Sequence, residues 1–231
     1  MSLDKDIVGS IEFLEVEGLQ GSTYLLKGPN GEQVKLNQSE VADEDEFEIG
    51  EEYSFFVYPN RSGELFATQN MPDITKDKYD FAKVLKTDRD GARIDVGLPR
   101  EVLVPWEDLP KIKELWPQAG DYLLVTLRID SNNQMFGRLA SETIVEGMFT
   151  PVMDDSKQNE MIEARAYRLL RVGSFLLSED GYKIFVHESE RKQEPRLGEK
   201  VEVRIIGHND KGELNGSFLP LAHERLDEEG E

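Results

Sequence analysis

The sequence contains one pattern three times. A glycine followed by an acidic residue precedes a short run rich in β-branched and aromatic residues, and the copies begin at Gly50, Gly120 and Gly198. A polar turn and a second short apolar run follow each copy, so each copy predicts a pair of strands. Gly120 lies 70 residues after Gly50, and Gly198 lies 78 residues after Gly120. Spacings of that size are typical of a small domain rather than of a solenoid repeat, so we expect three small β domains of similar design.

The domain boundaries follow from the polar segments between the copies. Residues 71–78 and 141–160 break the apolar pattern, which places a first domain at 1–72, a second at 73–145 and a third at 146–231. Two hairpins around a short helix or loop are typical of an OB-fold. The predicted fold class is therefore all-β, with three tandem five-stranded OB-fold barrels and short helical turns. One such turn is expected at 141–146, whereas 154–159 is expected to be flexible.

Cysteine usage and hydropathy limit the possible classes of protein. The 231 residues include no cysteine, which excludes disulfides, thiolate zinc sites and a cysteine nucleophile. The first residues have neither the basic head nor the apolar run of a signal peptide. No stretch approaches the roughly 18 apolar residues of a membrane helix. We expect a soluble, cytoplasmic protein without membrane contact.

The charge is strongly acidic but uneven. The formal net charge is −20, and residues 43–52 alone carry seven acids and no base. Such a charge argues against a general polyanion binder. The third domain is closer to balance. A nucleic acid is therefore expected to bind there with modest affinity, through base stacking more than through phosphate contacts, while the acidic remainder repels unselected nucleic acid.

The stretch 173–190 predicts the main candidate site. Apolar runs at 175–177 and 184–186 flank a Ser-Glu-Asp-Gly turn, which is a hairpin signal. Phe175 and His187 then stand on neighbouring strands, and two rings on a sheet face form a stacking platform for bases. A histidine is mostly neutral at physiological pH, so His187 is expected to stack or hydrogen-bond rather than act as a cation. Ser189 is expected to cap a short helix.

The order Gly-x-Phe, hairpin, Val-His-x-Ser-Glu resembles the S-one domain, an RNA-binding OB-fold. Residues 197–206 resemble its fourth strand, and residues 209–217 its last hairpin. The RNA face of that family uses an aromatic residue after the glycine, a histidine on the next strand, an aspartate in the last turn and an arginine on the fifth strand. The alternative is an unrelated small barrel with a buried phenylalanine and a surface histidine.

The resemblance can be carried over position by position in the third domain. It implies RNA contacts by Phe175 and His187, with Asn209 at the aspartate position and Asn215 at the arginine position. Two further candidates, Tyr182 and Lys183, lie in the hairpin between the rings and can add a ring edge and a phosphate contact. Their alternative role is that of ordinary solvated turn residues.

The second domain departs further from the pattern. Arg93 stands at the aromatic position and Pro105 at the histidine position, Asp130 keeps the acid, and Phe136 replaces the arginine. Arg93 and Phe136 can still hold a base, because guanidinium planes and rings both stack. The alternative is that Phe136 seals a domain interface. Trp106 is expected to be a core or interface residue.

The first domain has the weakest resemblance. Tyr24 lies near the aromatic position but one residue out of step, Asn37 and Asn60 replace the histidine and the aspartate, and Phe66 replaces the arginine. The surroundings are strongly acidic. This domain is expected to contribute least to RNA binding and to act through packing or a protein contact.

The module order resembles the bacterial conserved virulence factor B family. The resemblance rests on Phe-Val-His-Glu-Ser-Glu in the third domain and on the closing stretch 212–226. It implies an RNA-binding regulator that influences the expression of virulence factors. Members usually carry a further winged-helix domain after this point, so the resemblance implies that this domain is absent here. The acidic tail 226–231 is accordingly expected to be an artificial boundary.

No enzyme class is predicted. The 3 histidines lack metal-ligand spacing and there is no Gly-rich phosphate loop, so no catalytic residue, metal or cofactor is expected. The acids at 43–46 could be magnesium ligands of a nuclease, but solvated loop acids are the favoured interpretation. The main expectation is a regulator that binds single-stranded RNA through the third domain. The alternative is a protein-interaction scaffold whose acidic first module docks a basic partner.

Overall fold

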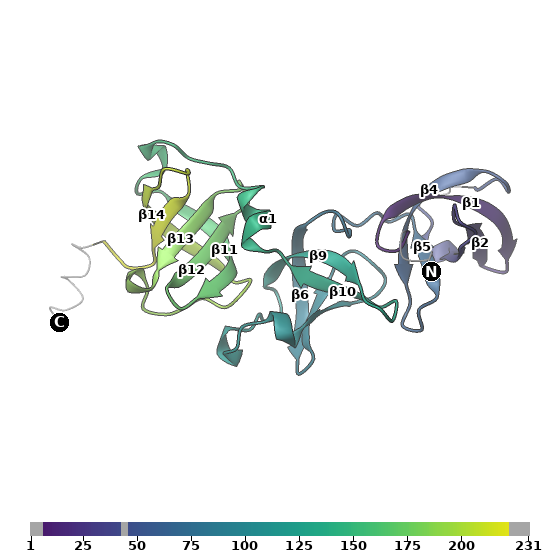
Figure 1. Ribbon diagram of the computed structural model, residues 1–231, viewed down its shortest axis with the longest axis horizontal. Helices are drawn as coiled ribbons and strands as arrows, with labels where there is room; N and C mark the ends of the chain where they lie inside the picture. The colour runs from purple at the N-terminus through teal and green to yellow at the C-terminus, as the bar shows by residue number, and fades with distance from the viewer. Residues whose placement is uncertain (1–6, 43–45, 222–231) are drawn as a thin grey trace. The chain divides into compact units, whose positions relative to one another are not determined.

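The computed structural model describes residues 7–42 and 46–221, and these form three closed five-stranded barrels (Figure 1). Helical structure in the described part is confined to short 3-10 turns and one α-helix, α1 (Glu142–Glu146). None of these helices is long and apolar enough to cross a membrane. The predicted fold class is confirmed, and so is the helical turn at 141–146. The acidic tail and the acids at 43–45 lie outside the described residues.

Barrel 1 is built from the segments that flank the Gly28–Gly31 turn and the Gly50 repeat. Its 3-10 turn, η2 (Gln38–Glu40), follows the third strand. Its strands are β1 (Ile11–Gln20), β2 (Thr23–Lys27), β3 (Gln33–Asn37), β4 (Glu52–Pro59) and β5 (Leu65–Thr68).

Barrel 2 has the same order of elements with a longer connection before its fourth strand. That connection contains η3 (Trp106–Asp108) and η4 (Lys113–Leu115). Its strands are β6 (Asp80–Asp88), β7 (Gly91–Asp95), β8 (Val102–Pro105), β9 (Tyr122–Ile129) and β10 (Met135–Leu139).

Barrel 3 follows α1 and η5 (Asp155–Lys157). The segment 154–159 contains this turn, in which the Asp154 carboxylate accepts a hydrogen bond from the Ser156 amide. The expectation that the segment is flexible stays a prediction. Its own 3-10 turn is η6 (Glu188–Glu190). The strands are β11 (Met161–Leu170), β12 (Gly173–Ser178), β13 (Lys183–His187), β14 (Lys200–His208) and β15 (Leu214–Ser217).

All three barrels share one topology. In each, the first strand pairs with the second and the fourth, and the third and fifth strands pair in parallel. A bulge interrupts each first strand at the same place, after Val16, Val84 and Ala166. A strand that closes a small barrel must bend to reach both partners, and a bulge supplies that bend.

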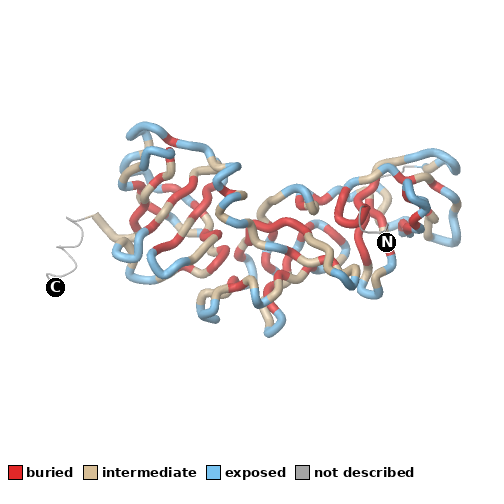
Figure 2. The backbone as a smooth tube through the Cα atoms, in the orientation of Figure 1, coloured by how far each residue is buried: buried red, intermediate tan, exposed pale blue. Residues whose placement is uncertain are grey.

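Strand alternation separates core from surface in barrel 3. Leu176 on β12 and Ile184 and Val186 on β13 point into the core, and each such burial contributes about 1.5–3 kcal/mol. The intervening side chains, among them Phe175 and Phe185, therefore point outward. Figure 2 shows the buried residues following the strands and the exposed ones gathered in the turns. This alternation places the candidate site on the outer face of β12 and β13.

The described chain divides into two compact units. One holds barrels 1 and 2 without residues 109–123, and the other holds residues 109–123 together with barrel 3.

Candidate nucleic-acid interface

Three rings form a row on the outer face of β12 and β13, which we call the aromatic strip: Phe175, Phe185 and His187. Phe175 and Phe185 are register partners with ring centroids 4.9 Å apart. The Phe185 and His187 centroids are 6.2 Å apart with the planes at 76°. The phenylalanines are half-buried and His187 is exposed. The predicted pair is thus on one surface, and Phe185 bridges it.

Phe185 is the functional candidate that the sequence analysis missed. It lies two residues before His187 on the same strand, and side chains at that spacing share a face. The alternation of β13 was therefore sufficient to find it.

Gly173 makes room for the middle of the strip. A Cβ at this position would lie 2.4 Å from the Val186 carbonyl oxygen and 2.5 Å from a ring carbon of Phe185. The Phe185 ring therefore rests against the bare backbone of Gly173, which is the register partner of His187.

Replacing Gly173 by alanine is expected to displace the Phe185 ring and the Val186 backbone. Overpacking of this kind costs about 1–3 kcal/mol of stability, and we expect about a 10-fold loss of affinity for an unpaired oligoribonucleotide, since a misplaced ring loses roughly one base stack. Anisotropy titration and a thermal melt measure the two effects. A Gly18→Ala variant controls for a glycine on a strand of barrel 1, where φ is not positive and a Cβ meets nothing within 4 Å. Unchanged affinity in Gly173→Ala would show that the ring position does not matter.

The His187 ring is held in place by Ser189, two residues later in the chain. Its Nδ1 accepts a hydrogen bond from the Ser189 amide at 3.2 Å and lies 2.8 Å from Ser189 Oγ. His187 is therefore the residue that caps η6, and the expectation that Ser189 caps it is wrong. With Nδ1 accepting, a neutral ring carries its hydrogen on Nε2, which gives the strip one donor at its exposed end.

Asn215 lies beside the strip, whereas Asn209 serves a turn. Asn215 is the parallel register partner of Phe185 and is partly exposed. Asn209 Oδ1 accepts from the amides of Lys211 and Glu213, and its Nδ2 donates to Glu213 Oε2 at 2.7 Å. The Asn209 side chain is thus used within the β14–β15 turn.

The same turn chemistry recurs in the other barrels. Asn60 Oδ1 accepts from the amides of Ser62 and Glu64, and Asp130 Oδ1 accepts from those of Asn132 and Gln134. A short side chain that accepts two backbone amides fixes the turn locally. This position of the repeat therefore shapes the last hairpin in every barrel.

Lys183 lies inside the protein rather than in solution. It begins β13, is 4% exposed, and its ammonium contacts the carboxylates of Glu142 and Glu213. Both alternatives from the sequence, a phosphate contact and a solvated turn residue, are therefore wrong for Lys183. Tyr182 also lies off the strip, because its ring packs against the barrel core and under the Lys157 ammonium.

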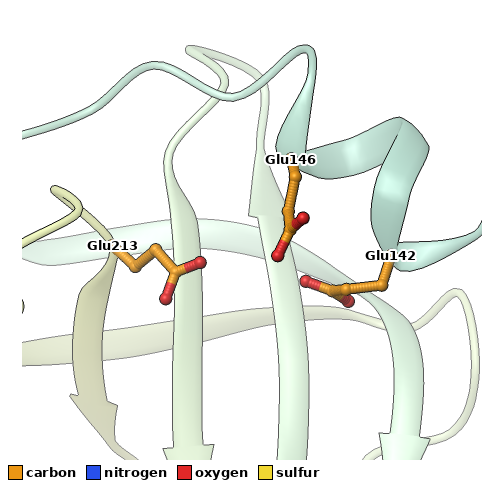
Figure 3. A group of neighbouring side chains, drawn as sticks. All are labelled: Glu142, Glu146 and Glu213. Carbon is orange, nitrogen blue, oxygen red and sulfur yellow. The ribbon is translucent and has the colours of Figure 1, made fainter.

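The carboxylates around Lys183 attach α1 to barrel 3. Figure 3 shows Glu142 and Glu146 extending from α1 toward Glu213, which comes from the turn before β15. Arg168 Nη1 and the Tyr167 hydroxyl also donate to Glu142. Three acids this close could hold a metal ion, but Lys183 and Arg168 already compensate their charge.

The pKa shifts in this cluster follow from its contacts. Burial alone would raise the pKa of Glu213, but the hydrogen bonds from Lys183 and Asn209 outweigh it and leave that pKa below its ordinary value. Burial alone would lower the pKa of Lys183, and the two carboxylates reverse this and raise it. Burial and the Glu142 carboxylate raise the pKa of Tyr167, so its hydroxyl stays a donor.

Barrel 2 brings its three candidates together around one groove of about 500 Å³, lined by Arg93, Asp130 and Phe136 among others. Arg93 is already engaged, with its guanidinium 3.4 Å from carboxylate oxygens of both Asp88 and Asp90. Phe136 lies under the Arg138 guanidinium at 5.5 Å. The groove can hold a flat group, but two of its cations, Arg93 and Arg138, are shared with protein carboxylates.

Trp106 differs from expectation. It is 53% exposed in η3, so it is not a core residue, and its role as an interface residue stays a prediction. It follows Pro105, the register partner of Gly91, and thus sits at the end of the face that corresponds to the aromatic strip.

Barrel 1 has no counterpart of the strip. The register places Leu25 opposite Lys35 and Thr23 opposite Asn37, where barrel 3 has its two phenylalanines and the Gly173–His187 pair. Tyr24 points to the other side and packs edge-on against Phe47, with centroids 5.1 Å apart. An offset of one residue along a strand reverses the face, so Tyr24 is a core aromatic.

Barrel 3 and barrel 1 differ in net charge. Residues 161–217 hold 10 basic and 10 acidic residues, a net charge of zero, whereas residues 7–70 hold 3 basic and 13 acidic residues, a net charge of −10. Half of these ten cations are paired with described carboxylates, for example Arg196 with Asp121 at 3.1 Å and Lys200 with Glu163 at 2.8 Å. Arg171 is exposed and has no partner among the described residues. It lies in the β11–β12 turn, next to the end of the strip that His187 occupies.

The fold agrees with what is found in similar proteins. Residues 148–220 match the family described as "Virulence regulatory factor CvfB, second domain", residues 79–138 match "CvfB first S1-like domain", and residues 8–70 match "S1 domain". The whole chain is 90% identical to Conserved virulence factor B of Staphylococcus epidermidis, of which it covers 78%. This chain belongs to the conserved virulence factor B family. Another member, from Staphylococcus aureus, is 85% identical, and the chain covers 77% of it.

A solved structure is also similar to this member of the conserved virulence factor B family. A crystal structure described as a multidomain protein with nucleic acid binding domains, from Streptococcus pneumoniae, is 29% identical with a TM-score of 0.81. The match covers 92% of this chain and 74% of that one. The predicted family and the S-one-like nature of the modules are thereby confirmed. In this member of the family, the aromatic strip lies within the part that matches the CvfB second domain.

Proposed function

We propose that this chain is a regulator that binds single-stranded RNA through the aromatic strip of barrel 3, and that it contributes to the control of virulence factor expression in the cytoplasm as a binding protein rather than an enzyme. The observation that carries this proposal is the row of Phe175, Phe185 and His187 on a barrel whose residues 161–217 carry no net charge. The family's description as a virulence regulatory factor and the S-one-like domains support it.

Stacking supplies most of the affinity in this proposal. Each base that stacks on an aromatic side chain contributes about 1–3 kcal/mol, and the spacing of the two phenylalanine rings, 4.9 Å, suits adjacent flat groups. Five of the ten cations in residues 161–217 are paired with described carboxylates. Arg165 and Arg204 donate to backbone carbonyls, so few cations remain for phosphates. Arg171 is the cation best placed for one phosphate contact near His187.

The strip favours unpaired strands over duplexes. Bases in a duplex are stacked on one another, and their faces are not accessible to side chains. His187 Nε2 and the Asn215 amide border the rings and can bond base edges or a ribose 2′-hydroxyl, the group that distinguishes RNA from DNA. The groove of barrel 2, with Arg93, Phe136 and Asp130, is a secondary contact for single-stranded RNA.

Salt dependence tests this function. We expect a fluorescein-labelled oligouridine 12-mer to bind the whole chain with a slope of log K against log salt no steeper than about −1.5, since about two phosphate contacts are made and each contributes about −0.7 on single strands. A duplex RNA of the same length should bind at least about 10-fold more weakly, because it offers no free base face. A slope steeper than about −4, or equal affinity for the duplex, would mean that phosphate contacts dominate.

A further inference from the structure

An exposed phenyl ring stands on the outer side of barrel 1. Alternation along β1 places Leu14 and Val16 in the core and Ile11, Phe13 and Glu15 on the outside. Phe13 is 67% exposed and Ile11 is 47% exposed. Isolated surface apolar side chains are common, but these two lie at i and i+2 on one strand face and so form a single apolar strip.

Two carboxylates face each other at the end of this strip. The register places Phe13 opposite Ser54 and Glu15 opposite Glu52 on β4. Like charges directly opposite on a sheet destabilise it. Neither Glu15 nor Glu52 has an ion-pair partner within residues 7–42 and 46–221. We call the surface of Ile11, Phe13, Glu15, Glu52 and Ser54 the Phe13 face.

The corresponding face of barrel 3 shows that the fold does not require this arrangement. Counting from the shared bulge, Glu163 and Glu202 replace Phe13 and Ser54, and Arg165 and Lys200 replace the two facing glutamates. Lys200 Nζ lies 2.8 Å from Glu163. The same surface in barrel 3 is therefore polar and charge-compensated, whereas in barrel 1 it is apolar and bears two facing acids without an ion pair among the described residues, with Lys27 of β2 in register with Glu15.

The charge of barrel 1 decides which kind of partner fits. Residues 7–70 carry a net charge of −10, and a phosphate backbone would be repelled by it. A cationic polypeptide would instead be attracted, and basic side chains beside Glu15 and Glu52 would relieve their mutual repulsion. An apolar residue of the same segment would cover Phe13.

We propose that the Phe13 face docks a protein partner through a basic segment that carries apolar residues between its lysines or arginines. This interaction is separate from the RNA contact of barrel 3. Barrel 1 thereby acts as the attachment module and barrel 3 as the RNA-binding module.

The test uses the whole chain and a labelled 12-residue peptide of alternating lysine and leucine. We expect Phe13→Ser and the double variant Glu15→Gln/Glu52→Gln each to weaken peptide binding by about 10-fold, the usual effect of removing an interface anchor. A lysine–serine peptide should bind at least about 10-fold more weakly for the same reason. Amide shifts of β1 and β4 should change on peptide addition.

Matched variants on barrel 3 decide between docking and general attraction to an acidic protein. Met161→Ser and Glu163→Gln/Glu202→Gln change the corresponding face by the same chemistry, and they should leave peptide binding within about 2-fold, as for surface positions outside an interface. If they weaken it as much as the Phe13-face variants, the attraction is unspecific and the proposal is wrong. A dimer that dissociates in Phe13→Ser, or loss of RNA binding in that variant, would assign the face to a second copy or to RNA and would also overturn the proposal.

Discussion

Replacing Phe175 and Phe185 together by alanine is expected to reduce the affinity for an unpaired oligoribonucleotide by at least about 30-fold. Two stacked bases lose about 1–3 kcal/mol each, and about 1.4 kcal/mol corresponds to a factor of ten. The rings touch only one another, His187 and Tyr167 among the described aromatics near the strip, so their removal eliminates the platform. Fluorescence anisotropy with a labelled oligouridine 12-mer measures the loss.

Two controls separate ring chemistry from folding. Phe175→Leu/Phe185→Leu keeps apolar bulk on the sheet without a ring and should lose nearly as much affinity. Phe13→Ala removes an exposed ring from barrel 1 and should bind RNA like the parent chain. A double alanine variant that folds and binds within about 3-fold of the parent would exclude stacking on this strip, since that change is smaller than a single stacked base.

Replacing Lys183 by methionine is expected to destabilise barrel 3 by about 3 kcal/mol. Removing one partner of a buried ion pair typically costs about 3–5 kcal/mol, because the other charge stays buried without compensation. The low end applies because the side chains of Glu142 and Glu213 remain 23% and 20% exposed. Hydrogen exchange of the β13 amides reports this loss, since it measures the local free energy of unfolding.

A second substitution and the pH dependence test whether the carboxylates left without Lys183 cause the loss of stability. Lys183→Met/Glu213→Gln should regain part of the lost stability, because one orphaned charge is gone. The folded pKa of Glu213 lies below its ordinary 4.5, so its stabilisation is present above about pH 4.5 and is lost as pH falls through the folded pKa. The folded pKa of Lys183 lies above its ordinary 10.5, so its part is present below that pH and is lost as pH rises through the folded pKa. A Lys183→Met penalty that stays constant down to pH 2 would exclude these carboxylates as its cause.

The placement of Lys183 shows where sequence reasoning fails. The residue follows Gly181-Tyr182 in a polar turn, and that local pattern favours a solvated side chain. Its ammonium is buried because Glu142 arrives from a separate helix and Glu213 from a distant turn. Trp106 illustrates the converse, since it was expected to be a core or interface residue and η3 leaves its side chain about half exposed, outside the core.

The observed arrangement of the aromatic strip is closer to the sequence prediction than that of Lys183. Phe175 and His187 were assigned to one surface from their positions in a hairpin, and the structure places both there with Phe185 between them. Tyr24 follows the same logic, since its one-residue offset from the aromatic position already indicated the opposite face.

The amino-acid order alone determined the number of barrels, their strand sequence and the face of each strand on which a ring lies. These features depend on alternation and turn residues, which act over a few neighbouring positions. Only the folded chain decided which charges are buried, which rings touch and which carboxylates stay uncompensated. Those properties arise where distant segments meet, and burial changes the energy of a charge far more than its neighbours in sequence can.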